Sequence, residues 1–181
     1  MSLVYSPAED SFLLSSVVKD KIPKILLKNE DLKVLEIGSS SGIQLKALFE
    51  SGIKKQNIFA CDINSNAVKH CKNLGFNCFQ SDLFENINGK YPLIIFNPPY
   101  LPEDSSEPKD SKISTTGGKK GGEIINEFLQ QVKNHLSKDG RIFLLTSSLT
   151  KGIKWKGYNK KLVAKQKLFF EELYVWEINL K

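Results

Sequence analysis

The feature that most constrains this chain is a regular alternation of short apolar runs with stretches of helical character. The apolar runs occupy residues 34–37, 58–61, 76–80, 93–96 and 141–146. Stretches with the spacing or the end signals of helices lie at residues 43–51, 66–74 and 124–136. Strands that are apolar throughout are typical of a parallel sheet covered by helices on both faces. The pattern therefore predicts an α/β fold, a three-layer sandwich with a mostly parallel central sheet.

The two ends of the chain extend this pattern. Residues 1–30 are predicted to form an N-terminal helical segment, in which apolar side chains keep helical spacing until Pro23 interrupts the helix. Residues 161–167 and 174–179 predict a closing strand pair, which gives the sheet an antiparallel C-terminal strand. Because 181 residues suit one core better than two, we expect a single domain over residues 1–181.

One stretch, residues 103–122, has no periodicity and is rich in serine, lysine, aspartate and glycine. A loop of this length inside a compact domain is usually either a functional lid or a disordered segment. Because it directly follows the motif at residues 97–100, we expect a lid or a substrate-contacting loop.

Composition excludes several classes of protein. No apolar run approaches the roughly 18 residues that cross a bilayer, and residues 1–10 lack the pattern of a secretory signal. We therefore expect a cytoplasmic protein that does not contact a membrane. Cys61, Cys71 and Cys78 have no CxxC spacing, and His70 and His135 lack partners at metal-ligand spacing. We expect neither a disulfide nor a bound metal.

The positive charge of the chain is concentrated near its C-terminus. The net charge is +6, and seven lysines without an intervening acid lie in residues 151–167. Such a segment can bind nucleic acid, the ribosome or an acidic protein, but it can equally be a solvated lysine-rich face. Both interpretations stay open.

Three predicted strands end in residues suited to a nucleoside. Glu36 begins the segment Glu36-Ile37-Gly38-Ser39-Ser40-Ser41-Gly42, Asp62 ends the next strand, and Asp82-Leu83 follow the third. The glycines allow close backbone approach, Asp62 can accept both ribose hydroxyls, Asp82 can accept from an adenine amino group, and Leu83 can pack on the ring. Each feature alone could be an ordinary turn or helix cap. No phosphate-binding P-loop is present, which favours a nucleoside with a charged amino-acid tail over a pyrophosphate.

The motif Asn97-Pro98-Pro99-Tyr100 follows an apolar strand and suits a planar amine. The side-chain carbonyl of Asn97 and the backbone carbonyl of Pro98 can hold the two hydrogens of an NH2 group. The ring of Tyr100 can stack on a planar amide or base. An amide nitrogen is a poor nucleophile, so such a site would work by positioning and electrostatics. The alternative is a Pro-Pro turn that merely ends a strand.

Together these motifs resemble the class I S-adenosyl-L-methionine-dependent methyltransferases, with their Rossmann-like fold. Within that class they resemble the HemK-like branch in its archaeal and eukaryotic form, which methylates glutamine in translation release factors. The segments that carry the resemblance are Tyr5-Ser6-Pro7-Ala8-Glu9-Asp10-Ser11-Phe12-Leu13-Leu14, Val34 to Gly42, Cys61-Asp62-Ile63-Asn64, Asp82-Leu83, Asn97 to Pro102 and Gly117-Gly118-Lys119-Lys120-Gly121.

The resemblance implies a function and a set of site residues. S-adenosyl-L-methionine would contact Ser11, Glu36, Gly38, Asp62, Asp82, Leu83 and Asn97, with S-adenosyl-L-homocysteine as the product. Asn97, Pro98, Pro99 and Tyr100 would hold the target, which is the N5 amide of the glutamine in the GGQ motif of a peptide chain release factor. Alternatives are N6-adenine methylation in RNA or DNA, protein lysine methylation, and a non-catalytic module that binds the cofactor.

The resemblance also implies a partner. The sequence departs from the family's pattern at two places. Relatives of this small size bind a zinc-containing activator subunit, which we expect to dock on the apolar edge strand at residues 76–80. Ser40 stands where the family usually has a glycine. Thr115 and Thr116 stand where an aromatic residue often precedes the glycine pair.

Overall fold

The centre of the molecule is a seven-stranded sheet with the order β3-β2-β1-β4-β5-β7-β6. The computed structural model describes residues 6–105, 108, 112 and 114–181. The strands are β1 (Val34–Ile37), β2 (Ile58–Asp62), β3 (Asn77–Gln80), β4 (Tyr91–Phe96), β5 (Leu136–Ser147), β6 (Tyr158–Lys167) and β7 (Glu172–Leu180). The pairs among β1 to β5 are parallel, whereas β7 runs antiparallel to both β5 and β6. The predicted mostly parallel sheet with an antiparallel end is confirmed.

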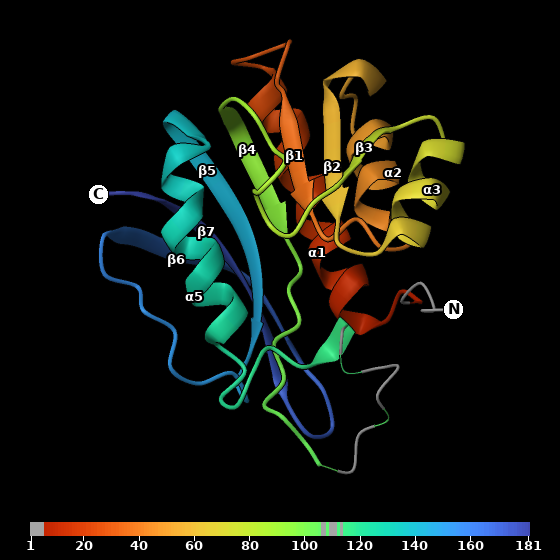
Figure 1. The fold of residues 1–181 in the computed structure, drawn as a ribbon. Helices are drawn as coiled ribbons and strands as arrows, with labels where there is room; N and C mark the ends of the chain where they lie inside the picture. The colour runs from red at the N-terminus through yellow and green to blue at the C-terminus, as the bar shows by residue number, and fades with distance from the viewer. Residues whose placement is uncertain (1–5, 106–107, 109–111, 113) are drawn as a thin grey trace.

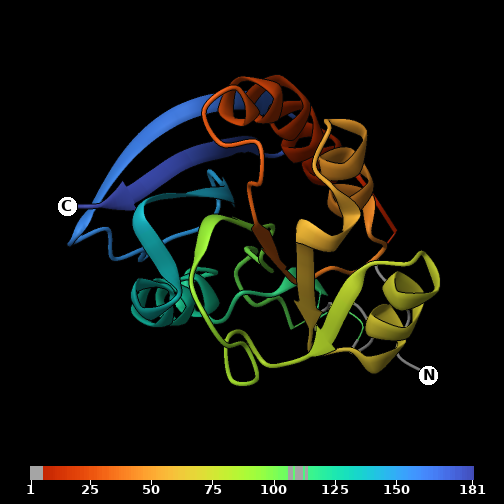
Figure 2. The same cartoon turned by 90° about the horizontal axis from the view of Figure 1, so that it is seen from above.

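Helices cover both faces of this sheet. They are α1 (Glu9–Leu26), α2 (Ile43–Glu50), α3 (Ser65–Asn73) and α5 (Glu123–Gln131), with short 3-10 turns at Lys55–Asn57 and Val132–Asn134. Figure 2 shows α1 and α2 on one side of the sheet and α5 on the other. Alternate strand residues point into the two layers, since Val34 packs with α1 and α2 and Leu35 packs with α5. This arrangement confirms the three-layer sandwich.

Two predicted helix ends were wrong. Pro23 lies inside α1, which continues to Leu26. Proline removes one hydrogen bond of the helix and crowds the preceding turn, but the fully buried Ile22 just before it keeps this last turn packed on the core. The helix predicted over residues 124–136 ends as an α-helix at Gln131, and Leu136 already pairs with Tyr91 of β4. Pairing with a neighbouring strand, which is distant in sequence, therefore decided the structure of this segment.

The register of the sheet brings three strand ends together. Ile37, the last residue of β1, lies level with Cys61 of β2 and with Phe96 of β4. The chain leaves all three strands at the lower end of the sheet in Figure 1. The strand order also reverses between β1 and β4, and ligands of open α/β sheets bind outside the carboxyl ends of the strands at such a point. Separately, none of the described helices combines the length and apolar character that a membrane crossing needs.

Candidate functional site

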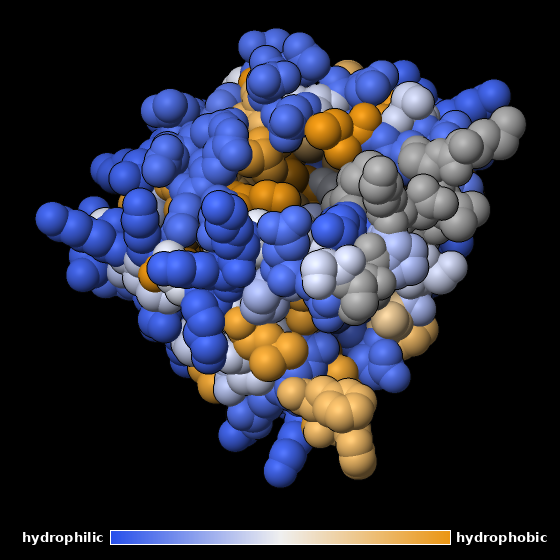
Figure 3. Space-filling view, turned by 60° about the horizontal axis from the view of Figure 1, so that its bottom comes forward, coloured by the Kyte–Doolittle hydropathy of each residue, from blue (hydrophilic) through white to orange (hydrophobic). Residues whose placement is uncertain are grey.

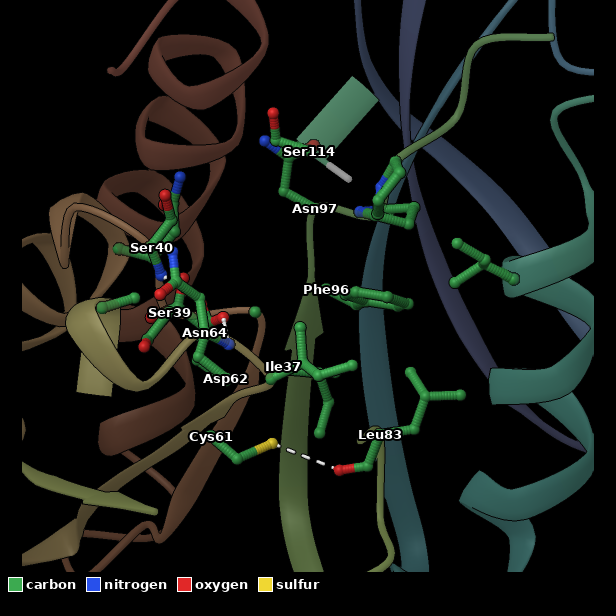
Figure 4. Close-up of a pocket in the computed structure, with 18 of the residues that line it drawn as sticks. Ile37, Ser39, Ser40, Cys61, Asp62, Asn64, Leu83, Phe96, Asn97 and Ser114 are labelled. Carbon is green, nitrogen blue, oxygen red and sulfur yellow. Dashed lines mark hydrogen bonds between the residues drawn. The ribbon is translucent and has the colours of Figure 1, made fainter. Parts of the chain in front are cut away.

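A cavity of about 590 Å³ opens at the carboxyl ends of β1, β2 and β4. Figure 3 views this end of the molecule and shows a hollow with apolar side chains inside it. The cavity brings together all but one of the residues predicted from the sequence, namely Ser11, Glu36, Gly38, Asp62, Asp82, Leu83, Asn97, Pro98 and Pro99. In Figure 4, Ser39, Ser40 and Asp62 lie on one side of the cavity, and Phe96 and Leu83 lie on the other.

The loop after β1 is held in one conformation by backbone contacts. The amides of Gly38 and Ser39 donate to the carbonyl of Cys61 at 2.8 and 3.0 Å. Gly38 has a φ of 71°, which glycine adopts readily, but Ser40 has a φ of 43°, which side chains disfavour. The usual glycine at this position therefore has a backbone reason, and Ser40 tolerates the conformation at a cost.

Asp62 is fixed by the same loop. The amides of Ser40 and Asn64 donate to its two carboxyl oxygens, each at 2.8 Å. Burial raises the pKa of Asp62, and the two amide hydrogen bonds oppose this rise. Each oxygen keeps a lone pair that can accept a ligand hydroxyl.

Glu36 is a buried acid with an unsatisfied oxygen. Its side chain is 3% exposed, and Oε2 has no hydrogen-bond partner among the described residues. Burial raises the pKa of Glu36 well above its usual range, and repulsion from Cys78 and Asp62 acts in the same direction. A buried polar atom without a partner is costly unless a ligand satisfies it.

The charges around the cavity select the kind of ligand that fits. Five acids line it, Asp10, Glu36, Asp62, Asp82 and Glu127, and no lysine or arginine is among its described lining residues. Acceptors of this kind suit a ligand rich in hydroxyl and amino donors and disfavour a phosphate group. The residues present therefore fit a nucleoside better than a nucleotide.

Asn97 is oriented by Asp10, which lies in the motif at residues 5–14 but was assigned no role from the sequence. Its Nδ2 donates to Oδ2 of Asp10 at 3.0 Å, while its Oδ1 is buried without a partner among the described residues. Asp10 is 6% exposed and shares a face of α1 with the buried Leu13, Leu14 and Val17. An acid at these spacings on an apolar helix face was the available signal.

Gln44 is a second residue that the sequence reasoning missed. It is 2% exposed in α2, its Nε2 donates to the carbonyl of Ser11 at 2.9 Å, and its Oε1 accepts from Ser15 at 3.0 Å. The side chain therefore fixes α1 against α2 where both line the cavity.

Tyr100 lies outside the cavity lining. Its side chain is half-buried and packs against both core clusters. Its amide donates to Thr115 at 3.1 Å, and its carbonyl accepts from Thr150 at 2.9 Å. The stacking role for this ring stays a prediction, because the described packing supports the turn instead.

The segment after the turn packs closely on it. A Cβ on Gly117 would lie 2.5 Å from the carbonyl oxygen of Pro99 and still closer to that of Gly121, so only glycine fits there. Ser114 and Thr116 line the cavity. Residues 106–107, 109–111 and 113 of the predicted lid over 103–122 lie outside the described residues, and the lid stays a prediction.

The three cysteines lie in the interior of the protein. Cys61, Cys71 and Cys78 are buried and free, and Cys61 donates to the carbonyl of Leu83 at 3.3 Å. Among the residues that the structure describes, no group of three His, Cys, Asp or Glu side chains is arranged to hold a metal ion.

Comparisons with known proteins agree with this geometry. The family described as Methyltransferase small domain matches residues 15–155. The chain is 41% identical, over 95% of its length and 89% of the relative's, to a Methanocaldococcus jannaschii protein provisionally named a protein N5-glutamine methyltransferase. It is 31% identical to Methyltransferase HEMK2 of Homo sapiens, over 79% of this chain and 71% of that one.

Solved structures show the same fold at low identity. A ribosomal protein L11 methylase from Lactobacillus delbrueckii subsp. bulgaricus superposes with a TM-score of 0.61. Its identity to this chain is 17%, and the match covers 99% of this chain and 82% of the other.

Proposed function

This chain belongs to the Methyltransferase small domain family, and from that premise we propose that it methylates the N5 amide of the glutamine in the GGQ motif of a peptide chain release factor. The observation that carries this proposal is Asn97, whose Oδ1 is buried without a described partner beside a cavity. Relatives support the substrate class, since one that is 28% identical is named the eRF1 methyltransferase catalytic subunit of Schizosaccharomyces pombe. Such a substrate places the reaction in the cytoplasm.

S-adenosyl-L-methionine is the proposed methyl donor, and it would supply a sulfonium-bound methyl group and leave as S-adenosyl-L-homocysteine. Glu36 and Asp62 would accept its ribose hydroxyls, because both carboxyls are buried at the cavity and Glu36 lacks a described partner for one oxygen. Asp82 and Leu83 would hold the base, and Gly38 and Ser11 would hold the amino-acid tail. The acidic lining supports this assignment, since it contains no described cation for a phosphate.

The chain's own contribution to catalysis is positioning. An amide nitrogen shares its lone pair with the neighbouring carbonyl and is therefore a weak nucleophile. Oδ1 of Asn97 and the carbonyl of Pro98 would accept the two amide hydrogens and fix the plane of the target nitrogen. Two consecutive prolines and the contacts of Tyr100 and Gly117 hold this corner rigid. Fixed acceptors cost no reorganisation when the methyl group is transferred.

The test is a methyl-transfer assay with labelled S-adenosyl-L-methionine. Release factor should be labelled, whereas its variant with alanine for the GGQ glutamine should not. The Asn97→Ala enzyme should lose at least roughly 100-fold in rate, the typical effect of removing one preorganised hydrogen bond at a reacting centre. Label in RNA and none in release factor would overturn the proposal.

A second candidate is methylation of the amino group of adenine in nucleic acid. All seven lysines of residues 151–167 are exposed, and a flipped base presents the same planar amine as a glutamine amide. Lys160 also lies over the rings of Trp155 and Trp176, at 4.5 and 4.1 Å from their centroids. The methyl-transfer assay decides between the two substrates when total RNA is offered beside release factor. If the protein methylates no nucleic acid, the same lysines would still offer a surface for binding the ribosome or an RNA.

The proposed activator subunit, a small zinc-binding protein, would dock on β3. Among the described residues, this strand is the first in the sheet order and pairs with β2 alone, so no described strand covers its other edge. Phe79 within it is 44% exposed, and Ile63 beside it is 55% exposed. An open edge with apolar side chains can accept a strand from another chain. Phe79→Lys should abolish co-elution with such a subunit, and unchanged co-elution would count against this surface.

A further inference from the structure

Asp10 contacts the proposed catalytic turn from a distant part of the chain. It lies in the first turn of α1, and Asn97 follows β4, yet the Asp10 Oδ2 to Asn97 Nδ2 distance is 3.0 Å. Its other oxygen, Oδ1, accepts from the amide of Ser11 at 2.5 Å and from the Ser11 hydroxyl at 3.2 Å. A buried acid that bridges a helix to this turn needs an explanation beyond helix capping.

The chemistry of the pair determines which way the Asn97 amide faces. A carboxylate offers only acceptors, so Asn97 must present its NH2 group to Asp10 and turn its oxygen the other way. That oxygen is the buried Oδ1 with no partner among the described residues, and Asn97 lines the cavity. The orientation thus follows from donor and acceptor rules and does not depend on which end of the amide is assigned as nitrogen.

We propose that Asp10 is a positioning residue for methyl transfer, which locks Asn97 with its oxygen toward the target amine. The inference rests on the proposed function, because it concerns the same turn. An amide without this contact could rotate and present a donor where the target needs an acceptor. The hydrogen bond to a charged partner also draws the amide toward its polarised form, which makes Oδ1 a stronger acceptor.

An isosteric substitution of Asp10 should reverse the orientation of the Asn97 side-chain amide. In Asp10→Asn, the oxygen of the new side chain stays with the Ser11 amide, so its NH2 group faces Asn97. Asn97 must then rotate to accept this hydrogen bond, and its own NH2 group turns toward the target. The double variant Asp10→Asn with Asn97→Asp restores both features, since the new aspartate accepts from residue 10 and offers its second oxygen to the target.

The experiment measures kcat and KM on release factor, and the Kd for S-adenosyl-L-homocysteine by calorimetry. Asp10→Asn should lower kcat by about 100-fold, with Kd within about two-fold of the wild type. The double variant should regain at least roughly ten-fold of the lost rate. Glu9→Gln is the matched control, because it removes the neighbouring exposed acid from the same helix turn, and it should leave kcat, KM and Kd unchanged.

A second readout tests the contact without activity. The side-chain NH2 signal of Asn97 in a ¹⁵N correlation spectrum, assigned by its loss in Asn97→Ala, should move in Asp10→Asn and stay in place in Glu9→Gln. A raised Kd with unchanged kcat, or failure of the double variant to regain rate, would overturn the inference and make Asp10 a ligand contact or a structural residue. If wild-type enzyme does not label release factor, the proposed function fails, whereas the spectrum still reports on the Asp10–Asn97 contact.

Discussion

Ser40 shows how a residue of this site can serve binding at a cost in stability. It adopts a φ of 43° because its amide must reach Asp62, at 2.8 Å. Ser40→Gly should raise the unfolding free energy by up to about 1 kcal/mol, since strain relief exceeds the lost rigidity of the unfolded chain. Ser40→Val should lower it by about 1–2 kcal/mol. Urea unfolding measures the change in free energy for both variants. The control is Ser41→Gly, which should be destabilising because φ at Ser41 is not positive.

The buried acid Glu36 should make stability depend on pH. Burial raises its pKa, so the folded state binds a proton more tightly than the unfolded state does. The unfolding free energy should therefore fall as pH rises above 4.5, the ordinary value for glutamate, and continue to fall until the raised pKa is passed. Asp62, whose pKa is also raised, adds to the same slope.

Glu36→Gln should flatten this pH dependence and weaken ligand binding. The variant should be more stable than the wild type at pH 8, by at least about 1 kcal/mol, because it buries no unsatisfied charge. It should bind S-adenosyl-L-homocysteine at least roughly ten-fold more weakly, since it loses a charged acceptor. Urea unfolding from pH 5 to pH 8 and calorimetry give the two numbers. Glu9→Gln, at an exposed site, should reproduce neither change, and an equal slope in both variants would refute the assignment.

At the scale of elements, the sequence predicted the local secondary structure of most segments. It did not predict the pairing and side-chain contacts between segments that are distant in sequence. The apolar runs placed β1, β2 and β4, because a buried strand must be apolar whatever its neighbours are. The extension of β5 back to Leu136 depends on pairing with Tyr91, which no local pattern reveals. The Asp10–Asn97 contact joins residues 87 positions apart, so the sequence offered only a buried acid on a helix face.

The contact between the catalytic turn and the segment after it gives a prediction at this scale. A Cβ on Gly117 would meet the backbone oxygens of Pro99 and Gly121, which cannot move away as a flexible side chain could. Gly117→Ala should shift the turn and reduce methyl transfer by at least roughly 100-fold. Gly89→Ala is the control, because a Cβ there meets nothing within 4 Å although φ is +87°. It should cost about 1 kcal/mol of stability and no activity, and equal activity losses would contradict the close-approach argument.

At the scale of the whole molecule, the proposed ligand should stabilise the folded state by binding to it. A compound that binds only the folded state at 100 times its Kd adds about 2.7 kcal/mol, which raises the melting temperature of a domain this size by several degrees. S-adenosyl-L-homocysteine should do so, because it offers hydroxyl and amino donors to Glu36, Asp62 and Asp82. ADP should not, because its phosphates would meet five acids and no described cation at the cavity. Asp62→Ala should remove the shift with S-adenosyl-L-homocysteine. A shift with ADP that Asp62→Ala leaves intact would contradict both the ligand class and its place in the cavity.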